Sequence, residues 1–355
     1  MVSHFSTGKK ESNNMGRTIE FTIEHGDISS FEADVVALKY ARNFYGADQF
    51  VAHILYNAGI SYSDIKPQIG ECAFINTCNS IKAPYALFVG VKNLYEFGYK
   101  EIRDFAVMVL NSLLNKAPEA RHLAMTIHGP GYGLDEVEAL MAQFIGYLYV
   151  IQNGVIPPGL EYISIVELNS QRVKRLRMGF EKNIAGLGNI SKINNRWAYR
   201  LEMPQKFDYI TKRTRGLSEI EIAGTTSAAK PHVFAAMPFR KDMEDVFYYG
   251  IQSAAHANDL LCERVDQEAF TGDILDRVKE RIETATVVIA ELTGANPNVY
   301  LEVGYAWGKA VPTILLVKKP EEVCFDVRGQ KCLRYEIIKE LEESLTKELK
   351  GLLRK

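Results

Sequence analysis

The residues best placed to do chemistry are an Asn-Pro-Asn run at 296–298 and the glutamate that follows it, Glu302. An apolar run at 286–292 precedes them and predicts a buried parallel strand. A helix is predicted next, with Glu302 as a lone acid in its first turns. Open α/β sheets bind ligands at the carboxyl ends of their strands. A single carboxylate held there can attack or stabilise an electron-poor sugar carbon, which makes Glu302 the candidate catalytic residue.

Three loops would line one crevice if this sheet is parallel, because the carboxyl-end loops of adjacent strands meet. They follow predicted strands at 233–236, 260–264 and 287–292. Aromatic rings in these loops suit a flat base, whereas amides and carboxylates suit ribose hydroxyls. The candidate substrate-binding residues are Met237, Phe239, Arg240, Asp266, Asp273, Asn296, Asn298 and Tyr300. The sequence shows neither metal-ligand spacing nor a serine–histidine arrangement.

These motifs resemble the nucleoside 2-deoxyribosyltransferase-like fold and are also similar to TIR-like NAD-cleaving domains. The resemblance covers residues 231–335 and rests on the runs at 233–239, 264–266, 296–305 and 325–329. It implies that Glu302 attacks C1′ of a nucleoside. The transferases carry an aspartate six residues earlier, where this chain has Asn296. Simple cleavage of an N-glycosidic bond is therefore implied beside base exchange.

Cleavage of an N-glycosidic bond requires few catalytic groups. The base leaves while positive charge builds on the ribose, and a carboxylate opposite it stabilises that charge or bonds to C1′, as in glycoside hydrolysis. Nicotinamide is already cationic in NAD, so its departure requires no general acid. NAD is therefore the expected substrate, and no separate cofactor is expected.

A second set of candidates lies in the first half of the chain. Asp27 and Ile28 follow a predicted strand at 19–23, and Gly46 precedes a predicted helix at 49–57. A glycine-rich loop then joins a predicted strand at 122–128 to a predicted helix. The loop contributes Gly129, Gly131, Tyr132 and Gly133. Its backbone N–H groups and the N-terminus of the next helix would form a cradle for a diphosphate.

The order of these motifs resembles the macro domain, an ADP-ribose-binding module, over residues 18–185. The resemblance implies that Asp27 binds adenine, that the loop at 129–133 holds the diphosphate, and that Tyr132 lies near the ribose. Macro hydrolases carry an Asn-Ala-Ala-Asn segment after the second strand. This chain has Ala-Leu-Lys-Tyr-Ala-Arg at 37–42, which implies binding without hydrolysis.

Alternating strands and helices predict an α/β protein of two domains. We expect a flexible tail at 1–16, a macro-like α/β/α sandwich at 17–186, and a connector at 187–230 with room for a short hairpin. A smaller, doubly wound parallel-sheet domain follows at 231–355, with one helix predicted at 243–257.

The amino-acid composition and net charge of the chain narrow the classes of molecule that it is expected to bind. The chain has 355 residues, of which 47% are hydrophobic and 24% charged, as in ordinary globular proteins. Its net charge of −2 argues against nucleic acid or an anionic membrane as the main partner. The longest apolar runs are strand-sized, so no membrane span is expected. Five cysteines without metal spacing predict free thiols in a reducing cytoplasm.

Together the two halves predict a cytoplasmic N-glycosidase that cleaves NAD or a related nucleotide and is regulated by an ADP-ribose-like ligand. Bacterial antiviral effectors that couple a sensor domain to a TIR-like NADase share this layout. The resemblance also implies a homo-oligomer, because transferases of this fold often complete their site with a neighbouring subunit. Two alternatives stay open: a deoxyribosyltransferase of nucleoside salvage, and a non-catalytic sensor in which both domains only bind nucleotides.

Overall fold

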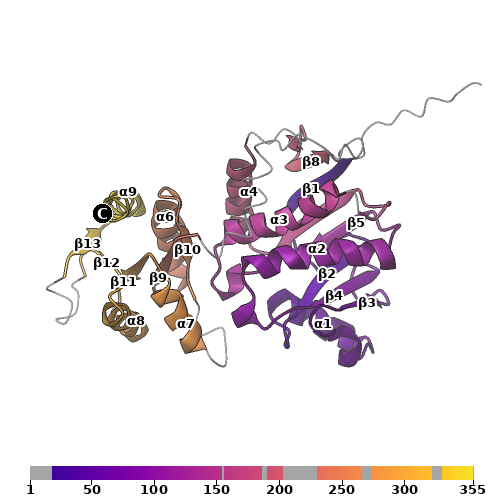
Figure 1. Ribbon diagram of the computed structural model, residues 1–355, viewed down its shortest axis with the longest axis horizontal. Helices are drawn as coiled ribbons and strands as arrows, with labels where there is room; N and C mark the ends of the chain where they lie inside the picture. The colour runs from indigo at the N-terminus through magenta and orange to yellow at the C-terminus, as the bar shows by residue number, and fades with distance from the viewer. Residues whose placement is uncertain are drawn as a thin grey trace, which may run out of the picture.

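The computed structural model describes residues 18–153, 156–185, 190–202, 230–265, 274–321 and 330–354. Two separate β-sheets, each packed between helices, form a larger domain from the first part of the chain and a smaller domain from the second (Figure 1). The predicted α/β fold of two domains is therefore confirmed. None of the helices in the described ranges is both long and apolar enough to cross a membrane.

The larger sheet has eight strands in the order β3-β4-β2-β5-β6-β1-β8-β7. They are β1 (Thr18–His25), β2 (Val35–Tyr40), β3 (Cys72–Asn76), β4 (Tyr85–Gly90), β5 (His122–Met125), β6 (Tyr162–Glu167), β7 (Ile190–Lys192) and β8 (Ala198–Glu202). The central strands β4, β2, β5, β6 and β1 are parallel, and antiparallel strands flank them on both sides. The carboxyl ends of five strands therefore lie along one edge.

Helices cover both faces of this sheet. One face packs against α1 (Gly46–Asn57), and the other packs against α2 (Tyr99–Lys116), α3 (Glu136–Gln152) and α4 (Ser170–Ile184). Strands buried on both faces are mostly apolar, which explains why β2 and β6 appear in the sequence as largely apolar runs rather than alternating ones.

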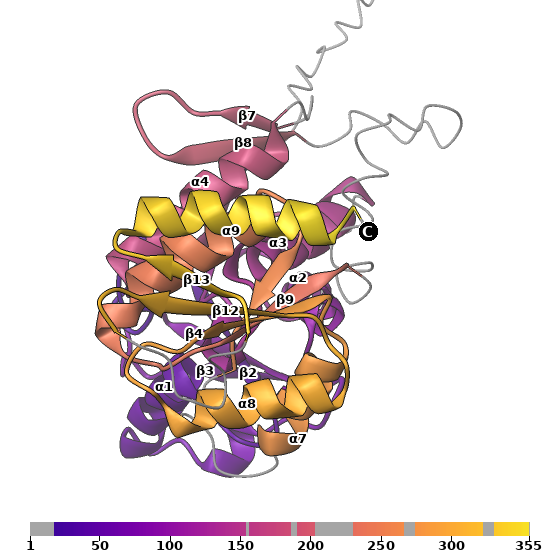
Figure 2. The same cartoon turned by 90° about the vertical axis from the view of Figure 1, so that its left-hand side faces the viewer.

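The smaller sheet is entirely parallel, with the strand order β10-β9-β11-β12-β13. Its strands are β9 (His232–Ala236), β10 (Leu261–Glu263), β11 (Val287–Glu291), β12 (Thr313–Lys318) and β13 (Cys332–Tyr335). One face packs against α7 (Ile274–Glu283) and α8 (Pro297–Gly308). The other packs against a π-helix, η6 (Val246–Gln252), and against α6 (Ser253–His256) and α9 (Ile338–Leu352). Figure 2 shows α8 and α9 on opposite sides of the strands. This doubly wound order places a topological switch point between β9 and β11.

Two parts of the fold differ from the expected pattern. The helix expected at 243–257 is divided into a 3₁₀ turn, η5 (Lys241–Met243), the π-helix η6 and the short α6. Apolar spacing alone does not separate an α-turn from the wider π-turn. The short hairpin expected within the connector is present as β7–β8, but β8 pairs with β1 and so extends the larger sheet. These short strands carry too few apolar residues to mark them in the sequence.

Candidate functional site

A cavity of about 690 Å³ opens at the carboxyl edge of the larger sheet. Sites for small molecules typically measure about 300–1,000 Å³. Its walls are the loops after β1 and β5, the ends of β2 and β6, and the beginning of α1. The structure brings six of the predicted nucleotide-binding residues together there: Asp27, Ile28, Gly46, Gly129, Gly131 and Tyr132. They meet because parallel strands end at the same edge.

The first wall is a rigid turn after β1. The Gly26 N–H donates to the Glu167 carbonyl of β6 at 3.1 Å, which fixes the turn to the sheet. Asp27 accepts hydrogen bonds at Oδ1 from the Ser29 N–H and hydroxyl, each at 2.8 Å. Asp27 Oδ2 takes part in neither bond. The turn therefore holds one carboxylate in a fixed position at the cavity while one of its oxygens is spared from shaping the turn.

A second wall is the N-terminus of α1. Its N-cap, Tyr45, makes no side-chain capping bond, and Gly46 begins the helix with φ +53°. The Asp48 and Gln49 N–H groups donate to the Tyr45 carbonyl at 3.1 and 3.4 Å. Gly46 and Ala47 precede them and line the cavity. A helix N-terminus without a side-chain cap favours an anion through its N–H groups and dipole.

The glycine-rich loop also lines this cavity. Gly129 has φ +114°, a conformation that favours glycine, and a Cβ there would lie 3.1 Å from Ile102 and Leu134. A Cβ on Gly131 would meet no atom within 4 Å. At Gly129 and Gly131 the loop thus brings backbone to the cavity wall, and Tyr132 adds a side chain.

Lys39 and Asp48 form a buried ion pair in the cavity lining. Their side chains are 6% and 3% exposed, and Lys39 Nζ lies 2.5 Å from Asp48 Oδ2. The Lys39 N–H also donates to Asp48 Oδ1 at 3.1 Å. At another wall Arg172 pairs with Glu136 and Glu167, each at 3.3 Å. Each of these carboxylates is matched by a cation, so they do not oppose an anionic ligand as isolated charges would.

Among the residues that line the cavity, two buried polar atoms lack partners within the described residues. They are His128 Nε2 and the Tyr132 hydroxyl, and both residues line the cavity. Burial lowers the pKa of His128 well below its ordinary value and raises the pKa of Tyr132. Both side chains are therefore neutral at pH 7. Because buried polar groups are normally paired, these two atoms indicate a place for a ligand or water.

The cavity also has an apolar rim that the sequence analysis missed. Phe50 and Leu168 are 51% and 71% exposed, and both line the cavity. Exposed apolar side chains are ordinary when single, but two at the mouth of one cavity offer a surface for a flat base. The signal was weak, since Phe50 could equally have belonged to the buried face of its helix.

Gly133 and the N-terminus of α3 have a different role from the one predicted. The Gly133 carbonyl accepts a hydrogen bond from the Arg264 N–H at 3.1 Å, and Gly133 does not line the large cavity. Asp135 caps α3 by accepting at Oδ1 from the N–H groups of Val137 and Glu138. This carboxylate cap occupies the helix end where the sequence analysis expected a diphosphate. The uncapped N-terminus at the cavity belongs to α1 instead.

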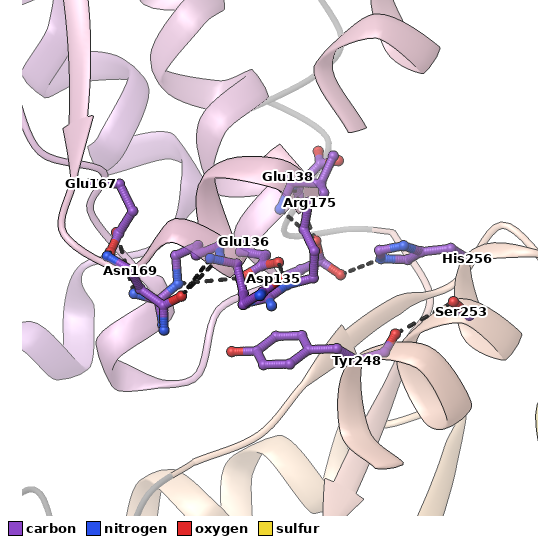
Figure 3. Close-up of polar contacts among 12 residues, drawn as sticks. Asp135, Glu136, Glu138, Glu167, Asn169, Arg175, Tyr248, Ser253 and His256 are labelled. Carbon is purple, nitrogen blue, oxygen red and sulfur yellow. Dashed lines mark hydrogen bonds and ion pairs between the residues drawn. The ribbon is translucent and has the colours of Figure 1, made fainter. Parts of the chain in front are cut away.

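Asp135 also joins the two domains. Its Oδ2 accepts a hydrogen bond from the Cys262 N–H at 3.1 Å and lies 2.6 Å from His256 Nε2 (Figure 3). Its backbone N–H donates to the Tyr99 hydroxyl, which itself donates to Glu263 Oε1 at 2.8 Å. One wall of the cavity is thus continuous with the contact between domains.

The predicted residues of the smaller domain lie on two loops at the switch point. A Cβ on Gly294, after β11, would lie 3.1 Å from Arg240 Nη1, after β9, so the loops meet. Met237 is buried, Phe239 is exposed, and Arg240 pairs with Asp242 at 2.9 Å.

The remaining predicted residues are placed by α8. Glu302 is 7% exposed in its second turn, and Tyr300 is half-buried. Asn296 is the N-cap, accepting from the exposed Asn298 N–H at 2.9 Å. Asp266, Asp273 and the 325–329 run lie outside the described residues.

A smaller pocket of about 190 Å³ lies between the domains. It combines residues from both predicted sets: Gly131 and Gly133 from the larger domain and Phe239 from the smaller. Arg264 completes it, with its guanidinium 4.1 Å from the centroids of the Phe239 and Phe247 rings. No group of three or more potential metal ligands occurs in the part of the chain that the structure describes.

Neither the protein-family models nor the curated proteins include a match to this chain. Similar solved structures include macrodomains, which match about half of the chain. A variant of the Oceanobacillus iheyensis macrodomain with ADPR is 12% identical and covers 49% of this chain and 97% of its own, with a TM-score of 0.37. The Trypanosoma brucei macrodomain in complex with ADP-ribose is 13% identical and covers 44% of this chain and 67% of its own, with a TM-score of 0.34.

Proposed function

We propose that the large cavity binds a nucleoside diphosphate of the ADP-ribose class. The observation that carries this proposal is the meeting of Asp27, the uncapped start of α1 and the Gly129–Gly131 backbone around one cavity of about 690 Å³. An adenine ring would lie by Asp27 and the apolar rim. The diphosphate would lie between α1 and the glycine-rich loop, where N–H groups favour an anion.

The lining supports binding rather than hydrolysis at this cavity. Hydrolysis would require a carboxylate or imidazole free to activate water. Asp27 is proposed to accept from the adenine, and Asp48 and Glu167 are held by Lys39 and Arg172. His128 is enclosed by aromatic rings, with the Phe105 centroid 4.6 Å from its own, and burial keeps its pKa low. The cavity therefore suits a regulatory ligand.

Calorimetric titration with ADP-ribose, ADP and AMP tests this proposal. In Gly131→Asp, the new side chain would extend into open space where the diphosphate is proposed to bind. We expect affinity for ADP-ribose to fall at least tenfold through charge repulsion. Gly351→Asp is the matched control, because a Cβ there also meets no atom and it lies on α9. Unchanged binding by Gly131→Asp would overturn the proposed diphosphate position.

A second candidate function is cleavage of an N-glycosidic bond at Glu302, with NAD as the substrate. The observation that favours it is a carboxylate only 7% exposed on the helix that follows the switch point. A carboxylate removed from water stabilises developing positive charge on a ribose more strongly than an exposed one. A ligand bound in the larger domain would regulate the reaction through the shared contact.

Product chromatography with NAD, with and without ADP-ribose, tests the second function. The wild type should release nicotinamide, and Glu302→Gln should lose at least 99% of that release because the amide carries no charge. Glu343→Gln, on the exposed side of α9, should retain full activity. Equal release by wild type and Glu302→Gln would exclude the assigned role.

A further inference from the structure

Arg172 brings a positive charge to the wall of the large cavity. Among the lysines and arginines that the structure describes, it lines this cavity together with Lys39. The Lys39 side chain is 6% exposed and lies 2.5 Å from Asp48, whereas the Arg172 side chain is 24% exposed. Arg172 and Gly131 also line the smaller pocket, so both lie at the border of the two spaces. Of the two cations, Arg172 is therefore the one that a ligand anion beside Gly131 can reach.

The carboxylates beside Arg172 do not use its whole guanidinium. Arg172 Nε lies 3.3 Å from Glu136 Oε2, and Nη1 lies 3.3 Å from Glu167 Oε2. Arg175 binds the same Glu136 more closely, through Nε at 2.5 Å and Nη2 at 3.2 Å. A guanidinium has five N–H donors. Arg175 thus supplies the positive charge that the buried Glu136 requires, and part of the Arg172 guanidinium stays available to a ligand oxygen.

Tyr248 of the smaller domain contacts both of these arginines. The Arg175 guanidinium lies 3.4 Å from the centroid of the Tyr248 ring, and Figure 3 shows this side chain reaching from the smaller domain toward Glu136 and Arg175. The Tyr248 hydroxyl acts on Arg172 by hydrogen bonding and by charge. Burial lowers the pKa of Arg172, but Glu167, Tyr248 and Glu136 together outweigh it, so the pKa is raised and the guanidinium stays charged. A residue of the smaller domain thus helps to hold the cation of the large cavity.

Holding Arg172 in advance favours binding. An arginine loses rotamer freedom when it binds an anion, and a side chain that is already held loses less. Glu136 and Glu167 belong to the larger domain, whereas Tyr248 comes from the π-helix η6 of the smaller one. Helical turns of this kind occur frequently at functional sites. The full set of contacts that orient Arg172 is therefore present only while the two domains are in contact.

We propose that Tyr248 is a positioning residue that orients Arg172 toward a phosphate of the ligand in the large cavity. Contact with the smaller domain then strengthens ligand binding to the larger one. This inference rests on the proposed function of the large cavity and specifies how that site is regulated. Because coupling between two binding events is reciprocal, the bound ligand strengthens the contact between the domains to the same extent.

A double-mutant cycle on the full chain tests this role, with calorimetric titration of ADP-ribose. Tyr248→Phe removes the hydroxyl but keeps the ring on Arg175, and should weaken binding at least threefold. Tyr249→Phe is the matched control, because it makes the same change at an exposed position of the same π-helix and should bind as the wild type does. Arg172→Gln should weaken binding at least fivefold. Adding Tyr248→Phe to Arg172→Gln should have no further effect, because Tyr248 acts through Arg172.

The outcomes separate this inference from the proposed function. If the wild type binds ADP-ribose but Tyr248→Phe binds as tightly as Tyr249→Phe, or Arg172→Gln changes nothing, the inference is overturned and the cavity proposal stands. An equal loss from Tyr248→Phe with and without Arg172→Gln would also overturn it, because a merely structural role acts in both backgrounds. The comparison of the two tyrosine variants holds even if Arg172→Gln does not fold. If the wild type does not bind ADP-ribose, both proposals are overturned.

Discussion

The two carboxylate oxygens of Asp27 have different tasks. Oδ1 shapes the turn by accepting from Ser29, and Oδ2 is the oxygen proposed to accept from adenine. In Asp27→Asn the amide oxygen can keep the turn while the charged acceptor is lost. A hydrogen bond to a charged group contributes about 1.5–3 kcal/mol, so affinity for ADP-ribose should fall about tenfold or more, as measured by calorimetry.

The exposed Asp64 supplies the control for this prediction. Asp64→Asn makes the same chemical change outside the cavity and should bind as the wild type does. Both variants should unfold at the wild-type urea concentration. If Asp27→Asn bound ADP-ribose as tightly as Asp64→Asn, Asp27 would be only a turn residue.

The residues that line the large cavity could be predicted from the sequence, whereas the residues that cap helices could not. Asp27, Gly46 and Gly129 all follow or precede strands and helices that the sequence marks clearly. Asn296, by contrast, fits both a substrate amide and a helix cap before a proline, and the structure shows the cap. His128 could not be chosen from the sequence, because only packing reveals that its Nε2 is buried without a partner.

At the scale of elements, the glycine-rich loop depends on one backbone conformation. Gly129→Ala would place a Cβ at φ +114° and within 3.1 Å of two side chains. Such conformations cost non-glycine residues about 1–3 kcal/mol. We expect urea denaturation to show a loss of this size in the free energy of unfolding.

Gly131→Ala, two residues later, is the comparison for that loss. Its Cβ would meet no atom, so stability should change by less than about 0.5 kcal/mol, as for ordinary surface substitutions. Equal stability of the two variants would show that the loop is not constrained at Gly129.

The elements buried on both faces were the predictable ones. β2, β6 and β11 are largely apolar runs because helices cover both sides of each sheet. Short strands such as β7, with the sequence Ile-Ser-Lys, form because they pair with β8. This pairing cannot be predicted from the residues of β7 alone. The π-helix was missed for a similar reason, since its apolar residues also fit an α-helix.

At the scale of the whole molecule, the contact between His256 and Asp135 should make domain association depend on pH. Burial lowers the pKa of His256, but the Asp135 carboxylate outweighs it, so the pKa lies above 6.5. Burial raises the pKa of Asp135, but His256 and backbone N–H groups outweigh it, so the pKa lies below 3.8. The contact is therefore fully formed between pH 3.8 and 6.5. It weakens as pH rises through the His256 pKa or falls through that of Asp135.

Small-angle X-ray scattering can follow this association. The radius of gyration should increase between pH 6 and pH 8.5 in the wild type. It should not depend on pH in His256→Gln, because the amide does not titrate. His53→Gln, at an exposed position of α1, should behave as the wild type does. An identical pH profile in all three proteins would rule out this contact as the pH-dependent element.

The contact between the domains could not be predicted from the sequence. Gly133 meets Arg264, and Asp135 meets Cys262, across more than a hundred residues. The sequence of either segment alone does not predict its contact with the other. For this reason the sequence suggested two separate sites, whereas the structure places residues from both around one pocket.

Hydrogen–deuterium exchange on the full chain, with and without ADP-ribose, tests the central claim most directly because it locates the ligand. The account predicts slower exchange at residues 26–28, 46–49 and 128–132, the backbone segments that line the large cavity, with α9 unchanged. No protection at these segments under saturating ADP-ribose, or protection confined to the smaller domain, would contradict it.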